Sequence, residues 1–175
     1  MKKIYCIRSA KAEDFSTGLR DYERSLNKKG RRQCETIGSY LLLRNIEPDI
    51  VLSSCALRAQ ESALKLLENY SFAGEQYFLE ELYFKPYEAL LDIVIVQDNA
   101  LSNMFVIGHT PQLNELVNHL SGEAIGHLDH MSVVALEFDI ESWSEIQTTK
   151  AKVAFHIYPK QFKYYMPRQM QRDLT

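Results

Sequence analysis

The feature that most constrains the fold is a series of short apolar runs, each followed by a polar break and a segment with helical periodicity. The first run covers residues 2–7 and carries apolar side chains on both faces, which is typical of a central parallel strand. Similar runs occupy residues 49–54, 77–79 and 104–107. Strands that alternate with helices in this way predict a mostly parallel sheet with helices on both of its faces.

Four helices are predicted between or after these strands, from the spacing of apolar residues and from residues that start or stop helices. Thr110 and Pro111 are expected to be the cap and the first position of the fourth helix, and Gly122 is expected to end it. The helices are predicted from Asn27 to near Asn45, after Ser54 with Arg58 in the first turn, from Pro86 to about Gln97, and from Thr110 to Leu120.

The last part of the chain has a different character. Two β-rich runs, residues 132–138 and 152–158, are joined by a link in which no helix fits. They predict an antiparallel pair at the edge of the sheet. The expected fold is therefore a single three-layer α/β domain over residues 1–160, followed by a C-terminal tail over residues 161–175. The basic and aromatic residues of the tail either pack back on the domain or form a weak RNA-binding pattern.

The composition narrows the functional classes. A length of 175 residues suits one packed domain, and a formal net charge of −3 gives no overall attraction to nucleic acid. The first apolar run is too short for a signal peptide or a membrane span. Three scattered cysteines form neither a close pair nor a metal-type spacing. We expect a cytoplasmic protein that has no metal or cofactor and binds neither nucleic acid nor membrane.

Polar side chains follow three of the predicted strands at the point where each strand ends. Arg8 and Ser9 follow the first strand, Arg58 comes shortly after the second, and His109 and Thr110 follow the fourth. Because ligands of an open α/β sheet bind beyond the carboxyl ends of its strands, these residues are expected to meet in one crevice. Two guanidinium groups and helix N-terminal N–H groups at one pocket predict an anion site that suits phosphate.

A structural alternative exists for each of the two arginines. Arg8 and Arg58 are followed in sequence by carboxylates, and Asp14 and Glu61 are the candidates for ion pairs. In that case the arginines stabilise the fold and bind no ligand.

Two short motifs occur in order after a first strand that ends in Arg8. Residues 53–59 read Ser-Ser-x-x-x-Arg-Ala, and residues 108–111 read Gly-His-x-Pro. With these motifs the sequence resembles the histidine phosphatase superfamily, and within it the SixA-type phosphohistidine phosphatases. The resemblance extends from Lys3 to about Lys160. It implies a phosphoglycerate mutase-like α/β fold and phosphatase chemistry.

The resemblance also implies roles for individual residues. Arg8 and Arg58 resemble the two arginines that hold the phosphoryl group, and His109 resembles the histidine that holds the phosphoryl oxygens and the developing charge. Ser9 stands where the family has its nucleophilic histidine, which becomes phosphorylated and is then hydrolysed. Larger members place a general acid after the third strand, and Glu81 is the candidate here, with a solvated carboxylate as the alternative.

The substitution at position 9 decides what chemistry is expected. Imidazole is a good nucleophile near neutral pH, because its pKa is about 6.5. A serine hydroxyl is a weak nucleophile unless an adjacent base removes its proton. His109 qualifies as that base only if its free nitrogen lies within about 3 Å of the Ser9 hydroxyl. We therefore expect phosphate binding to be kept and family-type hydrolysis to be weak or lost.

The remaining candidate residues have simpler interpretations. Cys55 is expected to be buried and inert, because a thiol-phosphatase loop requires arginine where Glu61 stands. Arg20 and Arg24 either fold over the pocket rim or lie on a solvated loop. The other histidines are interpreted as packed, surface or loop residues rather than metal ligands: His119, His127, His130 and His156.

Three functional hypotheses follow from these patterns. The first is a phosphohistidine phosphatase-like enzyme with altered or residual activity. The second is a catalytically inactive module that binds phosphate or a phosphoprotein, and the third is a structural protein with a vestigial pocket. For the first two, the expected partners are phosphate or a phosphorylated small molecule and a phosphohistidine-bearing signalling protein.

Overall fold

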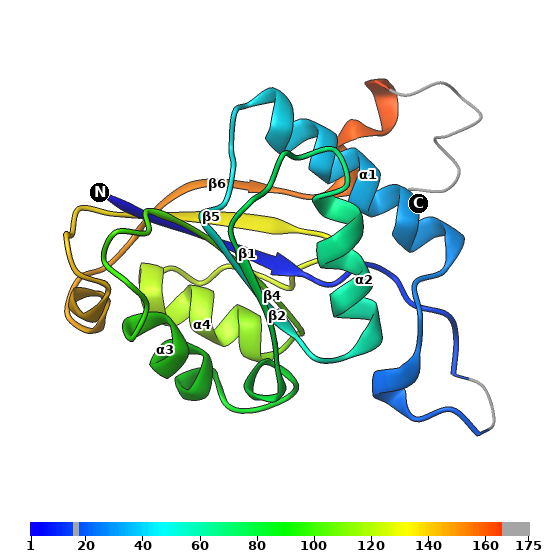
Figure 1. Cartoon of the computed structure of the whole chain (residues 1–175), viewed down its shortest axis with the longest axis horizontal. Coiled ribbons are helices and arrows are strands. Elements are labelled where there is room, and N and C mark those ends of the chain that lie inside the picture. The colour runs from blue at the N-terminus through cyan, green and yellow to red at the C-terminus, as the bar shows by residue number, and fades with distance from the viewer. Residues whose placement is uncertain (16–17, 166–175) are drawn as a thin grey trace.

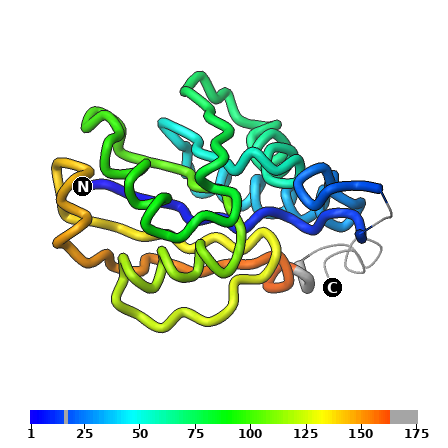
Figure 2. Tube along the Cα trace, turned by 90° about the horizontal axis from the view of Figure 1, so that it is seen from below, coloured from blue at the N-terminus to red at the C-terminus, as the bar shows by residue number. Residues whose placement is uncertain are grey.

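A single sheet forms the centre of the molecule. The computed structural model describes residues 1–15 and 18–165, with side chains up to Phe162. Its strands are β1 (Lys2–Arg8), β2 (Ile50–Ser54), β3 (Glu75–Leu79), β4 (Asn103–Gly108), β5 (Val133–Phe138) and β6 (Lys152–Ile157). They lie in the order β3-β2-β4-β1-β5-β6 (Figures 1 and 2). β1 to β4 pair in parallel, whereas β5 and β6 pair antiparallel, so the predicted sheet and edge pair are confirmed.

The two faces of the sheet carry separate cores, as the two-residue period of a strand requires. In β1, Ile4 and Cys6 belong to one buried cluster, and Tyr5 and Ile7 belong to the other. Helices α3 (Tyr87–Ile95) and α4 (Gln112–Ser121) cover the first cluster, and α1 (Lys28–Leu43) and α2 (Leu57–Leu66) cover the second (Figure 1). The three-layer α/β prediction is therefore correct.

The helix boundaries agree closely with the sequence pattern, except at the N-terminus of α4. The Asn27 side chain caps α1 by accepting a hydrogen bond from Gly30 N at 2.8 Å, and Gly122 ends α4 with a left-handed φ of 73°. Thr110 does not cap α4, because Pro111 occupies the N-cap position. The backbone itself closes the first turn, since Leu113 N donates to the His109 carbonyl at 2.9 Å.

The link between β5 and β6 contains a short helix, whereas no helix was predicted there. It is the 3-10 helix η3 (Trp143–Gln147), which the side chains of Ser142 and Glu145 cap reciprocally. Trp143 is completely buried in the core that α3 and α4 cover. The Ser-x-x-Glu capping signature was present in the sequence and would have predicted this turn.

The chain continues beyond β6 in the 3-10 helix η4 (Pro159–Tyr165), which crosses the predicted domain boundary at residue 160. The ring of Phe162 lies 5.0 Å from the ring of Tyr40 in α1. Residues 166–175 of the predicted tail lie outside the described residues.

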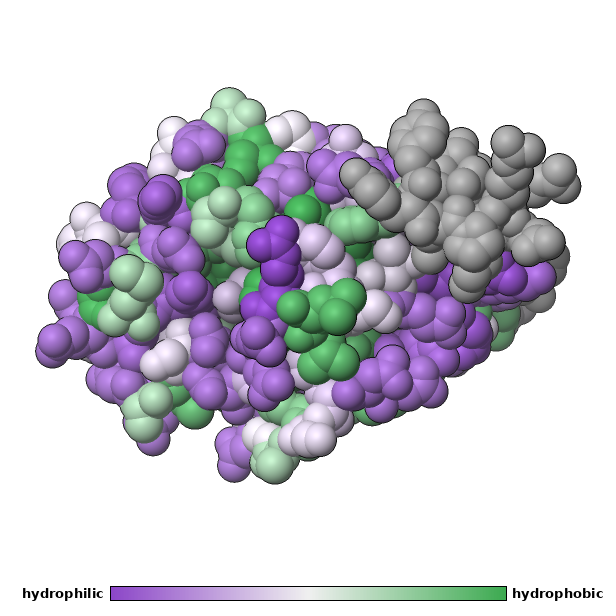
Figure 3. Space-filling model, turned by 90° about the horizontal axis from the view of Figure 1, so that it is seen from above, coloured by the Kyte–Doolittle hydropathy of each residue, from purple (hydrophilic) through white to green (hydrophobic). Residues whose placement is uncertain are grey.

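The surface is mainly polar. Figure 3 shows one face, on which hydrophilic side chains surround compact hydrophobic groups. Within residues 1–15 and 18–165, no helix is both long enough and apolar enough to span a membrane.

Candidate functional site

The carboxyl ends of β1 and β4 meet at one pocket with a volume of about 310 Å³. Parallel pairing places Arg8 beside Gly108, and Ser9 N donates to the Gly108 carbonyl at 2.9 Å. Ser9 and His109, the next residues after these two, therefore lie at the same pocket. The pocket is lined by Arg8, Ser9, Arg58, His109 and Thr110 together with polar residues of the surrounding loops. The predicted convergence of these five residues is what the structure shows.

Arg58 lies in the first turn of α2 and is almost fully buried, with 6% of its surface exposed. Its Nη1 donates to the Asp21 backbone carbonyl at 2.8 Å, and its Nη2 donates to Asp21 Oδ2 at 2.9 Å. Among the described residues Arg58 makes no ion pair with Glu61, whose carboxylate accepts a hydrogen bond from Leu26 N and pairs with Arg31. Arg58 is thus fixed at the pocket by the carboxylate of Asp21, which is not among the partners predicted from the sequence.

Asp21 sits in η1 (Asp21–Glu23), between Arg20 and Arg24, for which a solvated loop was one of the two expectations. Besides Arg58, its side chain accepts a hydrogen bond from the Tyr83 hydroxyl at 2.9 Å and pairs with Arg24 Nη2 at 3.0 Å. Partial burial acts to raise the pKa of Asp21, but the Tyr83 hydrogen bond and the Arg58 and Arg24 charges outweigh it and lower the pKa. Asp21 is therefore ionised, and its carboxylate holds Arg58 and Arg24 at the pocket.

Arg8 is held from the opposite side of the pocket. Its Nη1 donates to the Leu128 carbonyl at 2.6 Å and lies 2.9 Å from His127 Nε2. No ion pair with Asp14 occurs among the described residues, although Asp14 also lines the pocket. Burial lowers the pKa of Arg8, and the nearby Arg58 charge lowers it further. A buried guanidinium group (Arg58) and a half-buried one (Arg8) that repel each other create a site that an anion would stabilise.

His109 lies between these groups and is 5% exposed. Its Nε2 is 2.8 Å from Ser54 Oγ, and its Nδ1 is 3.4 Å from Ser9 Oγ. The Phe84 ring stacks on the imidazole at a centroid distance of 5.2 Å. Burial, together with the charges of Arg58 and Arg8, lowers the pKa of His109 to about 3. The imidazole is therefore neutral at physiological pH.

Ser9 is buried at the bottom of the pocket, with 3% of its surface exposed. The distance of 3.4 Å from its hydroxyl to His109 Nδ1 is longer than the roughly 2.6–3.2 Å of an activated hydroxyl–base pair. A low pKa also makes His109 a weak base. The geometry thus provides an anion site whose hydroxyl is poorly activated.

His130 is a pocket residue that the sequence reading assigned to a solvated loop. It lines the pocket, and its Nδ1 lies 3.2 Å from the Ser9 carbonyl oxygen. Burial and the Arg8 charge lower the pKa of His130 to about 4. No sequence pattern indicated this position, because it depends on how the loop before β5 folds back onto the end of β1.

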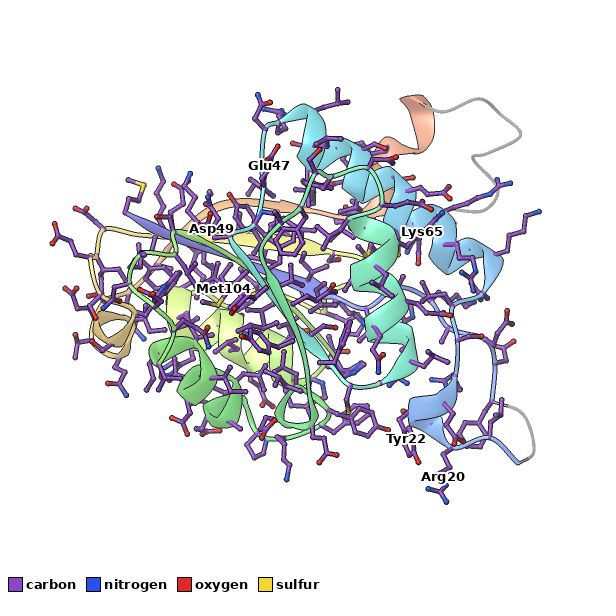
Figure 4. All side chains as sticks on the ribbon, viewed as in Figure 1. Arg20, Tyr22, Glu47, Asp49, Lys65 and Met104 are labelled. Carbon is purple, nitrogen blue, oxygen red and sulfur yellow. The ribbon has the colours of Figure 1, made fainter. Side chains whose placement is uncertain are left out.

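Of the remaining candidates, Arg24 lies at the pocket, whereas Glu81 and Arg20 lie away from it. Glu81 does not reach the pocket and instead lines a separate groove beside β3 and α3. The burial of its neighbour Leu82 fixes η2 (Glu80–Leu82) so that Glu81 is exposed away from the two arginines. Arg24 lines the pocket, whereas Arg20 bonds the Tyr22 hydroxyl at the periphery of the molecule (Figure 4). Glu81 as a general acid of this pocket is therefore not supported.

The structure gives no support to Cys55 as a nucleophile or to a metal site among the described residues. Burial and the nearby Glu80 charge raise the pKa of Cys55, which does not line this pocket. Among the described residues, no group of three or more His, Cys, Asp or Glu side chains is placed to hold a metal ion.

Comparison with known proteins defines the fold class. No protein-family model matches the sequence, and no curated protein sequence matches it. Solved structures do match: the chain has the phosphoglycerate mutase-like α/β fold that the histidine phosphatase superfamily adopts.

Three of the similar structures are described as SixA proteins, and two of them illustrate the match. The protein histidine phosphatase SixA, solved with tungstate, is 17% identical, with a TM-score of 0.80 over 91% of this chain and 99% of that chain. A proposed SixA from Agrobacterium tumefaciens is 21% identical, with a TM-score of 0.79 over 90% of this chain and 98% of that chain. A mycobacterial glucosyl-3-phosphoglycerate phosphatase is more distant, at 14% identity and a TM-score of 0.62 over 87% and 97% of the two chains.

Proposed function

We propose that this protein is phosphohistidine phosphatase-like and binds a phosphoryl group through Arg8, Arg58 and His109. The observation that carries the proposal is the convergence of two guanidinium groups, the buried Arg58 and the half-buried Arg8, on one pocket at the carboxyl end of the sheet. Guanidinium groups match the oxygens of a phosphoryl group in pairs, and burial strengthens such hydrogen bonds. The SixA-like fold supports the same substrate class.

His109 contributes as a neutral hydrogen-bond donor. Ser54 Oγ already accepts a hydrogen bond from Ala56 N at 3.2 Å, so its hydroxyl proton is available to donate to His109 Nε2. The imidazole proton then resides on Nδ1, on the side of Ser9. In this tautomer His109 donates to a phosphoryl oxygen and stabilises the charge that develops there.

Hydrolysis through position 9 is weak or lost in this proposal. Ser9 has a hydroxyl where the family has an imidazole. The ring nitrogen that faces this hydroxyl, His109 Nδ1, is 3.4 Å away and carries the proton in this tautomer, so it does not accept the hydroxyl proton. A serine phosphate ester would in any case turn over slowly. The second candidate is therefore a catalytically inactive module that binds phosphate or a phosphoprotein, and the same poorly activated hydroxyl favours it.

The first experiment measures phosphate and vanadate binding by titration calorimetry. Arg8→Ala/Arg58→Ala is compared with the wild type and with Arg31→Ala/Arg44→Ala, a control that removes two charges from the exposed part of α1 and its end. Each charged hydrogen bond contributes about 1.5–3 kcal/mol, so each pocket arginine should change the dissociation constant by about tenfold to a hundredfold. Equal affinities in the pocket variant and the control would support the vestigial-pocket hypothesis instead.

The second experiment separates the enzyme from the binding module. Phosphatase rates of the wild type and of Ser9→His are measured on a phosphohistidine protein and on an aryl phosphate. A negligible wild-type rate that Ser9→His restores would favour the binding module. Equal, robust rates in both proteins would show that the imidazole at position 9 is dispensable. Phosphorylated small molecules and phosphohistidine-bearing signalling proteins in the cytoplasm are the partners that we propose.

A further inference from the structure

The pocket contains a second imidazole whose protonation pattern is fixed by its surroundings. His130 Nδ1 lies 3.2 Å from the Ser9 carbonyl oxygen, and a carbonyl oxygen only accepts hydrogen bonds. Nδ1 must therefore carry the proton. In the neutral ring the lone pair then resides on Nε2, which has no hydrogen-bond partner among the described residues.

The loop that carries His130 is attached to the same residues that form the pocket. Met131 N donates to the Arg8 carbonyl at 3.1 Å, and Arg8 Nη1 donates to the Leu128 carbonyl at 2.6 Å. Met131 adopts a left-handed φ of 59°, which is unfavourable for a residue with a side chain. Such strain persists only where surrounding contacts over-determine the backbone, and it is concentrated at functional sites.

The other pocket imidazole is less suited to attack. His109 uses Nε2 for Ser54 and directs Nδ1 toward Ser9, so both nitrogens have neighbours. His127 is exposed, and its Nε2 contacts Arg8. Burial lowers the pKa of both His130, to about 4, and His109, to about 3, so both rings are neutral at physiological pH and the pKa does not distinguish them. Of the described histidines that line the pocket, only His130 has a ring nitrogen without a hydrogen-bond partner among the described residues.

We propose that His130 Nε2 is the phosphoryl acceptor of this pocket, in place of the imidazole that position 9 lacks. This inference rests on the proposed phosphoryl-binding function, and the substrate class that it names is a phosphoramidate, a compound with a P–N bond such as phosphohistidine. The leaving nitrogen of a phosphoramidate is protonated easily, so that no general acid is required in the place of Glu81.

The reaction proceeds in two balanced steps. The Nε2 lone pair attacks phosphorus, the P–N bond of the substrate breaks, and the leaving nitrogen keeps the bonding pair and takes a proton from solvent. Water then attacks phosphorus of the phosphorylated His130, the P–Nε2 bond breaks, and its electron pair returns to the imidazole. A water proton passes to solvent, and the products are phosphate and the free amine or imidazole.

The test uses potassium phosphoramidate as the phosphoryl donor and the full chain. Labelled protein is analysed by mass spectrometry under neutral conditions, because phosphohistidine is acid-labile and phosphoserine is acid-stable. His130→Asn keeps a side-chain donor for the Ser9 carbonyl but has no Nε2 nucleophile. His119→Asn is the matched control, because this half-buried histidine of α4 contacts Tyr87 outside the pocket.

We expect an acid-labile phosphoryl group on His130 in the wild type, in Ser9→Ala and in His119→Asn, and none in His130→Asn. Phosphate binding by the wild type is measured in parallel by calorimetry. Label on Ser9 or His109, or phosphate binding without any label, would overturn the inference and leave the binding function intact. Absence of phosphate binding in the wild type would refute the proposed function itself.

Discussion

Replacement of His109 by Asn should change the pH dependence of stability. In the folded protein the pKa of His109 is about 3, against its ordinary value of 6.5. Below pH 6.5 the unfolded chain binds a proton that the folded chain does not. The contribution of neutral His109 to the free energy of unfolding is therefore fully present above pH 6.5. It is lost progressively as the pH falls toward the pKa of the folded state.

The magnitude follows from the interval between the two values. One pKa unit corresponds to about 1.4 kcal/mol, and pH 5 lies about 1.5 units below the unfolded value, so His109 alone should remove about 2 kcal/mol of stability between pH 7 and pH 5. His130 acts with the same sign, because burial also lowers its pKa. The His109→Asn variant should thus lose about 2 kcal/mol less than the wild type over this interval.

The assay is urea unfolding, monitored by circular dichroism at pH 7 and pH 5. Gly38→Ala provides a control for destabilisation without a titrating group, because a Cβ at position 38 would lie 2.7 Å from the Leu66 carbonyl oxygen between α1 and α2. This control should lose stability and keep the full pH dependence. If His109→Asn keeps the full pH dependence as well, then His109 is not buried and neutral as described, and the argument for its role as a neutral donor fails.

Three further predictions concern the pocket wall. Asp21→Asn should tighten phosphate binding about threefold to tenfold in calorimetry, because a carboxylate that competes for the Arg58 guanidinium is removed; weaker binding would contradict this account. Ser54→Ala should weaken phosphate binding about fivefold, because one hydrogen bond that orients His109 is lost. An unchanged affinity would contradict the argument that Ser54 fixes the proton of His109 on Nδ1. Gly30→Ala should lower the free energy of unfolding by about 1–3 kcal/mol in urea titrations, because its Cβ would collide with the Lys11 carbonyl oxygen beside the pocket, and an unchanged midpoint would disagree with the structure.

The sheet and the meeting of Arg8, Arg58 and His109 could be predicted because both depend on short-range rules. Period-two burial defines a strand, and the ends of adjacent parallel strands meet at one edge. The register of β1 against β4 then brings position 9 next to position 109. None of this required knowledge of loop conformation.

The partners of these residues could not be predicted, because they come from loops. Asp21 reaches Arg58 across 37 positions of sequence, from a segment whose polar composition is equally typical of a solvated loop. His130 reaches the Ser9 carbonyl because the chain turns at Met131 through a left-handed conformation that no glycine or asparagine indicates. Glu81 was misplaced for a related reason, since the direction of its side chain depends on the burial of Leu82.

The most direct test of the central claim is a crystal structure of the protein soaked in vanadate or tungstate. The account predicts an ordered oxyanion in the pocket, within hydrogen-bond distance of Arg8, Arg58 and His109 Nδ1. An empty pocket at saturating anion, or an anion bound only at another surface, would contradict it.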